Sequence, residues 1–198
     1  MRREAGDHSP AFFLNSPMNW TKLSRTTAPT EPVVTLDDVK QHLAIAHSDE
    51  DTFLSVLIDV ATESLDGPNG IGVALLTQSW RMSLDNLSRV ITLPLGPVQS
   101  VDSVTFEGQT IDPESYTVDL DQNPAKIFVN IPRCGTRPGC VKVNFTAGFG
   151  DSGDDVPADL RHVIRMLVGT LYANRESTTT LALSDLQAVK TILDRYRS

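Results

Sequence analysis

The stretch Phe145 to Glu176, FTAGFGDSGDDVPADLRHVIRMLVGTLYANRE, decides how this chain folds. It begins as the end of a β-strand, passes through a turn rich in Gly and Asp, and becomes the longest helical pattern in the sequence. Asp154 and Asp155 stand where the positive end of a helix dipole favours carboxylates, and Pro157 suits a first helical turn. One apolar face follows the spacing of a buried α-helix: Leu160, Val163, Ile164, Leu167 and Leu171.

A second face of the same helix carries Met166, Gly169 and Ala173. Small residues on a helix allow another backbone to approach closely. The helix is therefore expected to contact two neighbours, and we predict that this second face lies at an interface between subunits.

Two shorter helices are predicted near the start of the chain. Thr35 and Asp38 have the spacing of a capping box and open a helix that ends near Ala44. A second helix opens at 48–51 and ends near Asp66, where Gly67 provides the stop. Its apolar arc is wide, which predicts burial against two other elements: Phe53, Val56, Leu57, Val60 and Ala61 in one stripe, with Leu54, Ile58 and Leu65 beside it.

From Thr77 the apolar period changes to two, which is typical of half-buried strands. Short connections rich in Gly, Pro, Asp and Asn favour antiparallel hairpins. The predicted strands are 78–84, 90–93, 101–106, 116–120, 126–130 and 141–146. The sequence therefore predicts an α+β fold, a helical bundle of about four helices with a small antiparallel β-sheet inserted between helices 2 and 3.

The two ends of the chain differ from its middle. Residues 1–32 show no periodicity and contain four prolines, so we predict a tail or an extended arm. Residues 33–183 form the main domain. A last short helix, 184–198, places Leu186, Val189, Leu193 and Tyr196 on one face. Such a helix either packs on its own domain or docks into a partner.

Charge is distributed unevenly along the 198 residues, whose net charge is −8. Residues 33–183 hold ten basic and twenty acidic side chains and so carry −10, whereas each end carries +1. Proteins that grip nucleic acid cluster Lys and Arg against phosphates, so this body argues against tight DNA binding. No apolar run reaches the roughly 20 residues that span a bilayer, and we expect no membrane partner.

The residues that usually carry chemistry are scattered. Cys134 and Cys140 are the two cysteines; they suggest a small disulfide loop or half a metal site, but two reduced thiols beside a turn are favoured in a reducing cytoplasm. The acidic run 49–51 is expected at a helix start from the dipole alone. No nucleophile elbow, phosphate-binding loop or zinc-protease motif is present. We predict no catalytic residue, no metal and no cofactor.

Three segments, in this order and spacing, resemble the head–tail connector (adaptor) proteins of long-tailed bacteriophages and of the related gene-transfer agents. They are Val34-Thr-Leu-Asp-Asp-Val-Lys-Gln-His-Leu, Leu93-Pro-Leu-Gly-Pro-Val-Gln-Ser-Val, and the strand, turn and helix that begin at Phe145 and end at Tyr172-Ala-Asn-Arg-Glu. The resemblance covers about residues 33–198.

The resemblance implies a structural particle protein, made in the bacterial cytoplasm and located at the head–tail junction. It implies a dodecameric ring between the portal and the stopper or tail, lining a channel through which DNA passes without specific binding. Because connectors of this family use their C-terminal segment against the portal, we assign the portal contact to Leu186, Val189, Leu193 and Tyr196. A monomeric binding module built on the β-sheet is the alternative. An unrecognised enzyme is less favoured still.

Overall fold

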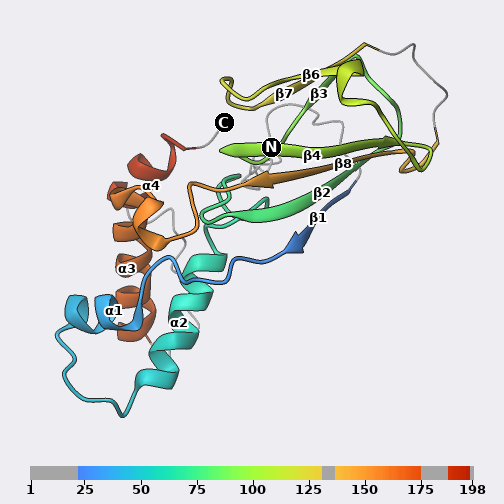
Figure 1. Ribbon diagram of the computed structural model, residues 1–198. Helices are drawn as coiled ribbons and strands as arrows, with labels where there is room; N and C mark the ends of the chain where they lie inside the picture. The colour runs from blue at the N-terminus through green and yellow to red at the C-terminus, as the bar shows by residue number, and fades with distance from the viewer. Residues whose placement is uncertain (1–21, 131–136, 175–186, 197–198) are drawn as a thin grey trace, which may run out of the picture.

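The computed structural model describes residues 22–130, 137–174 and 187–196. Its helices gather at one end of the molecule and its strands at the other (Figure 1). In chain order the elements are β1 (Lys22–Thr27), α1 (Leu36–Leu43), α2 (Asp51–Glu63), β2 (Gln78–Leu84), β3 (Val90–Thr92), β4 (Val98–Phe106), β5 (Gln109–Thr110), η1 (Pro113–Ser115), β6 (Tyr116–Asp119), β7 (Lys126–Val129), β8 (Val141–Ala147), η2 (Gly153–Asp155), α3 (Ala158–Ala173) and α4 (Gln187–Leu193). The predicted α+β class is confirmed.

The strands form two sheets. One has five strands in the order β1-β2-β8-β4-β5, and the other has three in the order β3-β7-β6. Every pairing between these strands is antiparallel, as the short connections predicted. Strands β2 to β8 lie between α2 and α3 in the sequence, whereas β1 precedes α1.

Strand β1 lies within residues 1–32, for which the sequence predicted a tail or an extended arm. Residues 22–27 pair with β2, with Lys22 opposite Ser83 and Arg25 opposite Trp80. The strand occupies a sheet edge, and most of its residues are exposed. An edge strand needs no apolar alternation, so the polar sequence KLSRTT gave no periodic signal. Residues 1–21 lie outside the described residues.

The helices surround their own hydrophobic core. Helix α3 contacts α1, α2 and α4, which confirms the prediction that it has more than one neighbour. Its predicted apolar face is buried at Leu160, Val163, Ile164 and Leu167, whereas Leu171 is partly exposed. Val168 also lies in this core, although the sequence analysis left it out.

A second core lies between the two sheets. Along β2, alternate residues face inward, so that Trp80, Met82 and Leu84 are buried. The three-stranded sheet adds Ile91, Ile127 and Val129 from its inner face to this core. Each lobe of the molecule therefore has a core of its own, and the lobes are joined by the segments between β1 and α1, between α2 and β2 and between β8 and α3 (Figure 1).

Gly148, at the end of β8, makes the junction between the lobes possible. Its φ is +143°, and a Cβ built there would lie 2.3 Å from the carbonyl carbon of Leu76. Any side chain would therefore collide with the backbone of the incoming segment. This constraint explains why glycine stands at position 148, directly after the strand.

Candidate assembly surfaces

The three segments that carry the family resemblance meet where the lobes join. Gly148 donates its N–H to the Pro97 carbonyl over 2.9 Å, which links the 145–150 and 93–98 segments. A Cβ at Gly153 would lie 2.4 Å from the Val33 carbonyl oxygen, so the start of the 33–43 segment also approaches closely. These segments hold the two lobes together.

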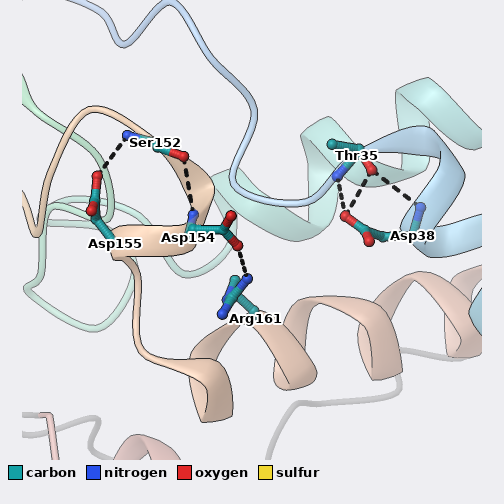
Figure 2. A network of polar contacts seen from close by, with 6 residues as sticks. All are labelled: Thr35, Asp38, Ser152, Asp154, Asp155 and Arg161. Atoms are coloured by element: carbon teal, nitrogen blue, oxygen red, sulfur yellow. Dashed lines mark hydrogen bonds and ion pairs between the residues drawn. The ribbon is translucent and has the colours of Figure 1, made fainter.

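The first of these segments begins with the capping box that the sequence predicted. The Thr35 Oγ1 accepts the Asp38 N–H at 3.1 Å, and the Asp38 carboxylate accepts the Thr35 N–H at 3.1 Å and its hydroxyl at 2.7 Å (Figure 2). These hydrogen bonds from Thr35, first from its side chain and then from its backbone, lower the pKa of Asp38 below 3.8. Arg165 and Arg161 on α3 add to the effect through their charge.

A second capping box lies just before α3. Ser152 donates its N–H to the Asp155 carboxylate at 2.9 Å, and the Ser152 hydroxyl oxygen accepts the Asp154 N–H at 3.3 Å (Figure 2). Ser152 caps the short helix η2 and Asp155 completes the box, so the two acids lie in the first turn of η2 and not in that of α3, where the sequence predicted them. Asp154 reaches α3 through its side chain instead, in an ion pair with Arg161 at 2.6 Å.

A buried polar cluster, which the sequence analysis did not identify, joins α2 to the five-stranded sheet. Asp66 accepts hydrogen bonds from the Leu75 N–H at 2.9 Å and from the Gln78 side-chain amide at 2.9 Å. Arg25 of β1 pairs with the same carboxylate at 3.2 Å and stacks over the Trp80 ring at 5.6 Å. Gln78 is 2% exposed, so its amide depends on these partners.

The predicted portal-binding face on α4 is occupied by the protein's own core in this structure. Val189 and Leu193 are buried in the helical core. The Tyr196 hydroxyl donates to Asp159 of α3 at 2.7 Å, and its ring packs edge-on against Phe149. Leu186 lies outside the described residues. The sequence analysis left open packing on the same domain, and this is the arrangement described here; contact with a portal stays a prediction.

The predicted subunit-interface residues on α3 lie in different surroundings. A Cβ at Gly169 would lie 3.3 Å from Leu43 of α1, so the small residue serves a contact within the chain. Met166 is partly buried against the helical core, and Ala173 is exposed. A contact between subunits at this face stays a prediction, and Ala173 is the member of the set that is open to a neighbour.

Helix α2 contacts both α1 and α3, as its wide arc predicted. Its buried residues are Leu54, Leu57, Ile58 and Ala61. The two helices still leave part of the arc exposed: Val56 is 52% exposed and Val60 48%, whereas Phe53, 36% exposed, packs against the Tyr172 ring at 6.5 Å. Val56 and Val60 form a half-exposed stripe, which we call the helix patch.

The β-sheet alternative depends on aromatic residues exposed on a sheet face. Trp80 is buried, and Phe106 and Tyr116 are partly buried against the sheet core. Phe128 is the exception, because it points away from the core and is 41% exposed. Val90, its cross-strand neighbour, is 44% exposed. We call Val90 and Phe128 the sheet patch.

The described part of the chain does not bring together the side chains of a catalytic or metal site. No group of three His, Cys, Asp or Glu side chains there is placed to hold a metal ion. Cys140 is a buried free thiol that donates to the Asp85 carbonyl at 3.3 Å, and Cys134 lies outside the described residues. A surface groove of about 510 Å³ lies between residues 28–33 and α2. No described helix is long and apolar enough to cross a membrane.

Residues 33–118 match the sequence model of the phage gp6-like head-tail connector proteins. This range contains α1, α2, the strands from β2 to β5 and most of β6, and the resemblance seen in the sequence is confirmed over it. A comparison with curated protein sequences gave no significant match.

The fold is similar to those of chains in gene transfer agent (GTA) particles. A chain in the neck of an empty GTA particle computed with C6 symmetry superposes with a TM-score of 0.73 at 22% identity, and one in the virion of a native GTA particle with 0.70 at 21%. A chain from the neck of a native particle computed with C12 symmetry gives 0.60 at 20%. Each alignment covers 89% of this chain and 95% of the other. At this level of identity the similarity establishes a common fold.

Proposed function

We propose that this chain, which carries the gp6-like connector pattern over residues 33–118, is a structural head–tail adaptor of a phage or a gene-transfer agent. The observation that carries the proposal is the agreement of fold with a GTA neck chain over 95% of that chain, in addition to the family match. The protein acts by binding its neighbours in the particle, and no catalytic step is assigned to it.

The adaptor forms a ring beneath the portal and connects it to the stopper or tail. The C6 and C12 symmetries of the GTA necks that contain similar chains support a ring, and twelve copies agree with both. Subunits that contact each other head to tail close into a ring when the rotation per subunit divides a full turn. Labelled protein in purified particles should appear as one ring at the head–tail junction. Label along the tail tube or over the capsid would contradict the proposal.

The acidic body suits the wall of a DNA channel. Residues 33–183 carry a net charge of −10, which repels phosphates and lets DNA pass without adhering. Purified protein should therefore not retard duplex DNA in a gel at moderate salt. Submicromolar binding that weakens as salt increases would show that basic side chains are gathered into a surface that the net charge conceals.

The C-terminal segment 184–198 is proposed to contact the portal. Since Val189 and Leu193 are buried against α3, this contact requires α4 to leave its own domain and present the same face to the portal. Burial of two such side chains stabilises the docked position by about 3 kcal/mol, and the portal must offer at least as much.

Truncation after Leu183 tests this portal contact. The shortened chain should stay folded, with reduced stability, and should fail to join portal-bearing heads, so that filled particles without tails accumulate. A truncated chain that unfolds would show that the domain needs α4 to stay folded, so that α4 is not free to leave it for the portal. A truncated chain that folds and still supports tail attachment would show that the portal binds elsewhere. Circular dichroism and electron microscopy of the particles separate these results.

A further inference from the structure

The outer face of the five-stranded sheet, which is turned away from the three-stranded sheet, carries polar side chains on every strand. Side chains alternate along β2 and β8, and those that point inward are buried in the sheet core. The outward ones are all polar: Ser79, Arg81, Ser83, Lys142, Asn144 and Thr146. Their partners on β4 in the strand register are serine and threonine. No described helix covers this face, so it is open to a partner (Figure 1).

Three cations lie close together on this face, each on a different strand: Lys22 on β1, Arg81 on β2 and Lys142 on β8. Lys22 and Lys142 are both in register with Ser83, so their Cα atoms are two strand spacings, about 10 Å, apart. Arg81 is two residues from Ser83 along β2, about 7 Å away. All three cations are exposed, and none forms an ion pair with a described residue. We call Lys22, Arg81 and Lys142 the cationic patch.

Nearby acids do not cancel the cationic patch. Asp102 of β4 lies on the same face, where its carboxylate accepts two hydroxyl hydrogen bonds, at 2.8 and 3.2 Å. Three cations and this one acid give the face a net charge of +2, although the whole chain carries −8. Asp85, just beyond β2, is half-buried and accepts the Gly139 N–H at 2.7 Å, and counting it leaves the balance at +1. Glu107 and Arg137 pair with each other at 3.4 Å and add no net charge.

The side chains on this face are of the kinds that contact phosphate. The Arg81 Nε donates to the Asn144 side-chain oxygen at 3.0 Å, and the Asn144 amide donates to the Ser103 hydroxyl at 2.8 Å. These bonds hold the guanidinium against the sheet and leave its two terminal nitrogens for a ligand. Lys, Arg, Ser, Thr and Asn side chains make most protein contacts to DNA phosphates. A protein partner would be expected to meet aromatic or apolar side chains at the centre of the contact, and this face offers none.

We propose that the outer face of the five-stranded sheet contacts the phosphate backbone of the DNA in the channel, without reading its sequence. Three cations neutralise few phosphates, so each copy binds weakly and the DNA can still slide past. The acidic remainder of the body repels the DNA and leaves this face as the point of contact. The inference rests on the proposed function for the presence of DNA beside the chain, and it adds which surface of the adaptor meets that DNA.

Fluorescence anisotropy of a short labelled duplex tests the surface in solution. The wild-type chain should bind weakly at low salt, and an increase from about 50 to 200 mM salt should weaken binding roughly 10- to 40-fold, as neutralisation of two to three phosphates requires. Arg81→Gln combined with Lys142→Gln should lower the affinity at least about tenfold and flatten this salt dependence. Arg89→Gln combined with Lys190→Gln, the matched control, removes two other exposed cations and should bind as the wild type does. Equal losses in both double variants, or no binding by the wild type at low salt, would overturn the inference.

Removal of the one acid from the face tests it in the opposite direction. Asp102→Asn should raise the affinity for the duplex several-fold at low salt, because it removes a charge that repels the phosphates. Asp59→Asn makes the same change of net charge on the exposed side of α2 and should have almost no effect. Equal gains from the two substitutions would mean that net charge alone governs binding, which contradicts a localised surface.

Cross-linking in filled particles tests the contact in place. A photoreactive amino acid in place of Ser83, at the centre of the cationic patch, should link the chain to packaged DNA on irradiation. The same amino acid in place of Val56 on α2 is the control and should link to DNA far less. If the chain is in the neck but position 83 links only to protein, or both positions link equally to DNA, the inference is wrong and the adaptor function stands. If the chain is absent from the neck, the proposed function fails, and the anisotropy comparison alone decides whether this face binds phosphate.

Discussion

Helices α2 and α3 have similar apolar patterns and different surroundings. Helix α3 contacts three other helices, and five of its apolar side chains are buried. Helix α2 buries four side chains on one side and leaves Val56 and Val60 about half exposed on another. The width of an apolar arc therefore shows how many contacts a helix requires, but not whether its own chain supplies them. In a subunit of an assembly, the apolar side chains that the chain itself leaves exposed are the candidates for contacts with other subunits.

The largest effect that separates the two helices is expected from truncation of a core side chain. Leu160→Ala should lower the free energy of unfolding by about 3 kcal/mol, because Leu160 is fully buried and its removal leaves a cavity. Val60→Ala, the matched control on α2, should change it by no more than about 0.5 kcal/mol. Urea denaturation followed by circular dichroism measures both. Equal losses would mean that the helix patch is covered within a single chain.

A smaller effect is expected from the polar cluster at the end of α2. Asp66→Ala should cost about 2 kcal/mol, because it leaves the Leu75 N–H and the buried Gln78 amide without their acceptor. Asp59→Ala, on the exposed side of the same helix, should cost almost nothing. The same denaturation experiment compares them. If Asp66→Ala were neutral, the lobes would be joined mainly by the backbone contacts around Gly148.

Much of this architecture can be predicted from local patterns. The strand 78–84 and the capping box at Thr35 follow from alternation and spacing, which neighbouring residues determine. Strand β1 could not be predicted in this way, because a polar edge strand has no period and depends on its partner β2. The same limit applies to Asp66 and Gln78, whose pairing depends on the junction between the lobes.

The candidate surfaces were predicted less well than the fold. Periodicity identifies the apolar side of a helix but does not show what covers it, so Val189 and Val60 look alike in the sequence. In the structure Val189 is fully buried and Val60 is 48% exposed. Likewise, Gly169 indicated a close approach correctly, but the approaching element is α1 of the same chain. Which surfaces are left for a partner depends on tertiary packing.

Helix α4 is intermediate between α3 and α2. Its apolar face is covered, as that of α3 is, but its short length limits how firmly it is held. Tyr196 reports on the docked position. Burial, followed by the hydrogen bond to Asp159 and the charge of that carboxylate, raises the pKa of Tyr196 from 10.0 to about 12. A raised pKa means that the unfolded or detached phenol ionises first. The stability that Tyr196 contributes is therefore complete below pH 10 and is lost as the pH rises through about 12.

The pKa of Tyr196 shows whether α4 is held against its domain, as α3 is, or is partly exposed, as α2 is. The difference between the alkaline absorbance titrations of the wild-type chain and Tyr196→Phe isolates one phenol, and it should titrate near pH 12. At neutral pH the same substitution should lower stability by about 1 kcal/mol, the value of one hydrogen bond. A midpoint near 10 would mean that α4 spends most of its time away from Asp159. Val189 and Leu193 would then be exposed for most of the time, as the helix patch of α2 is, and available to the portal. They would not be held in the core as the buried side chains of α3 are.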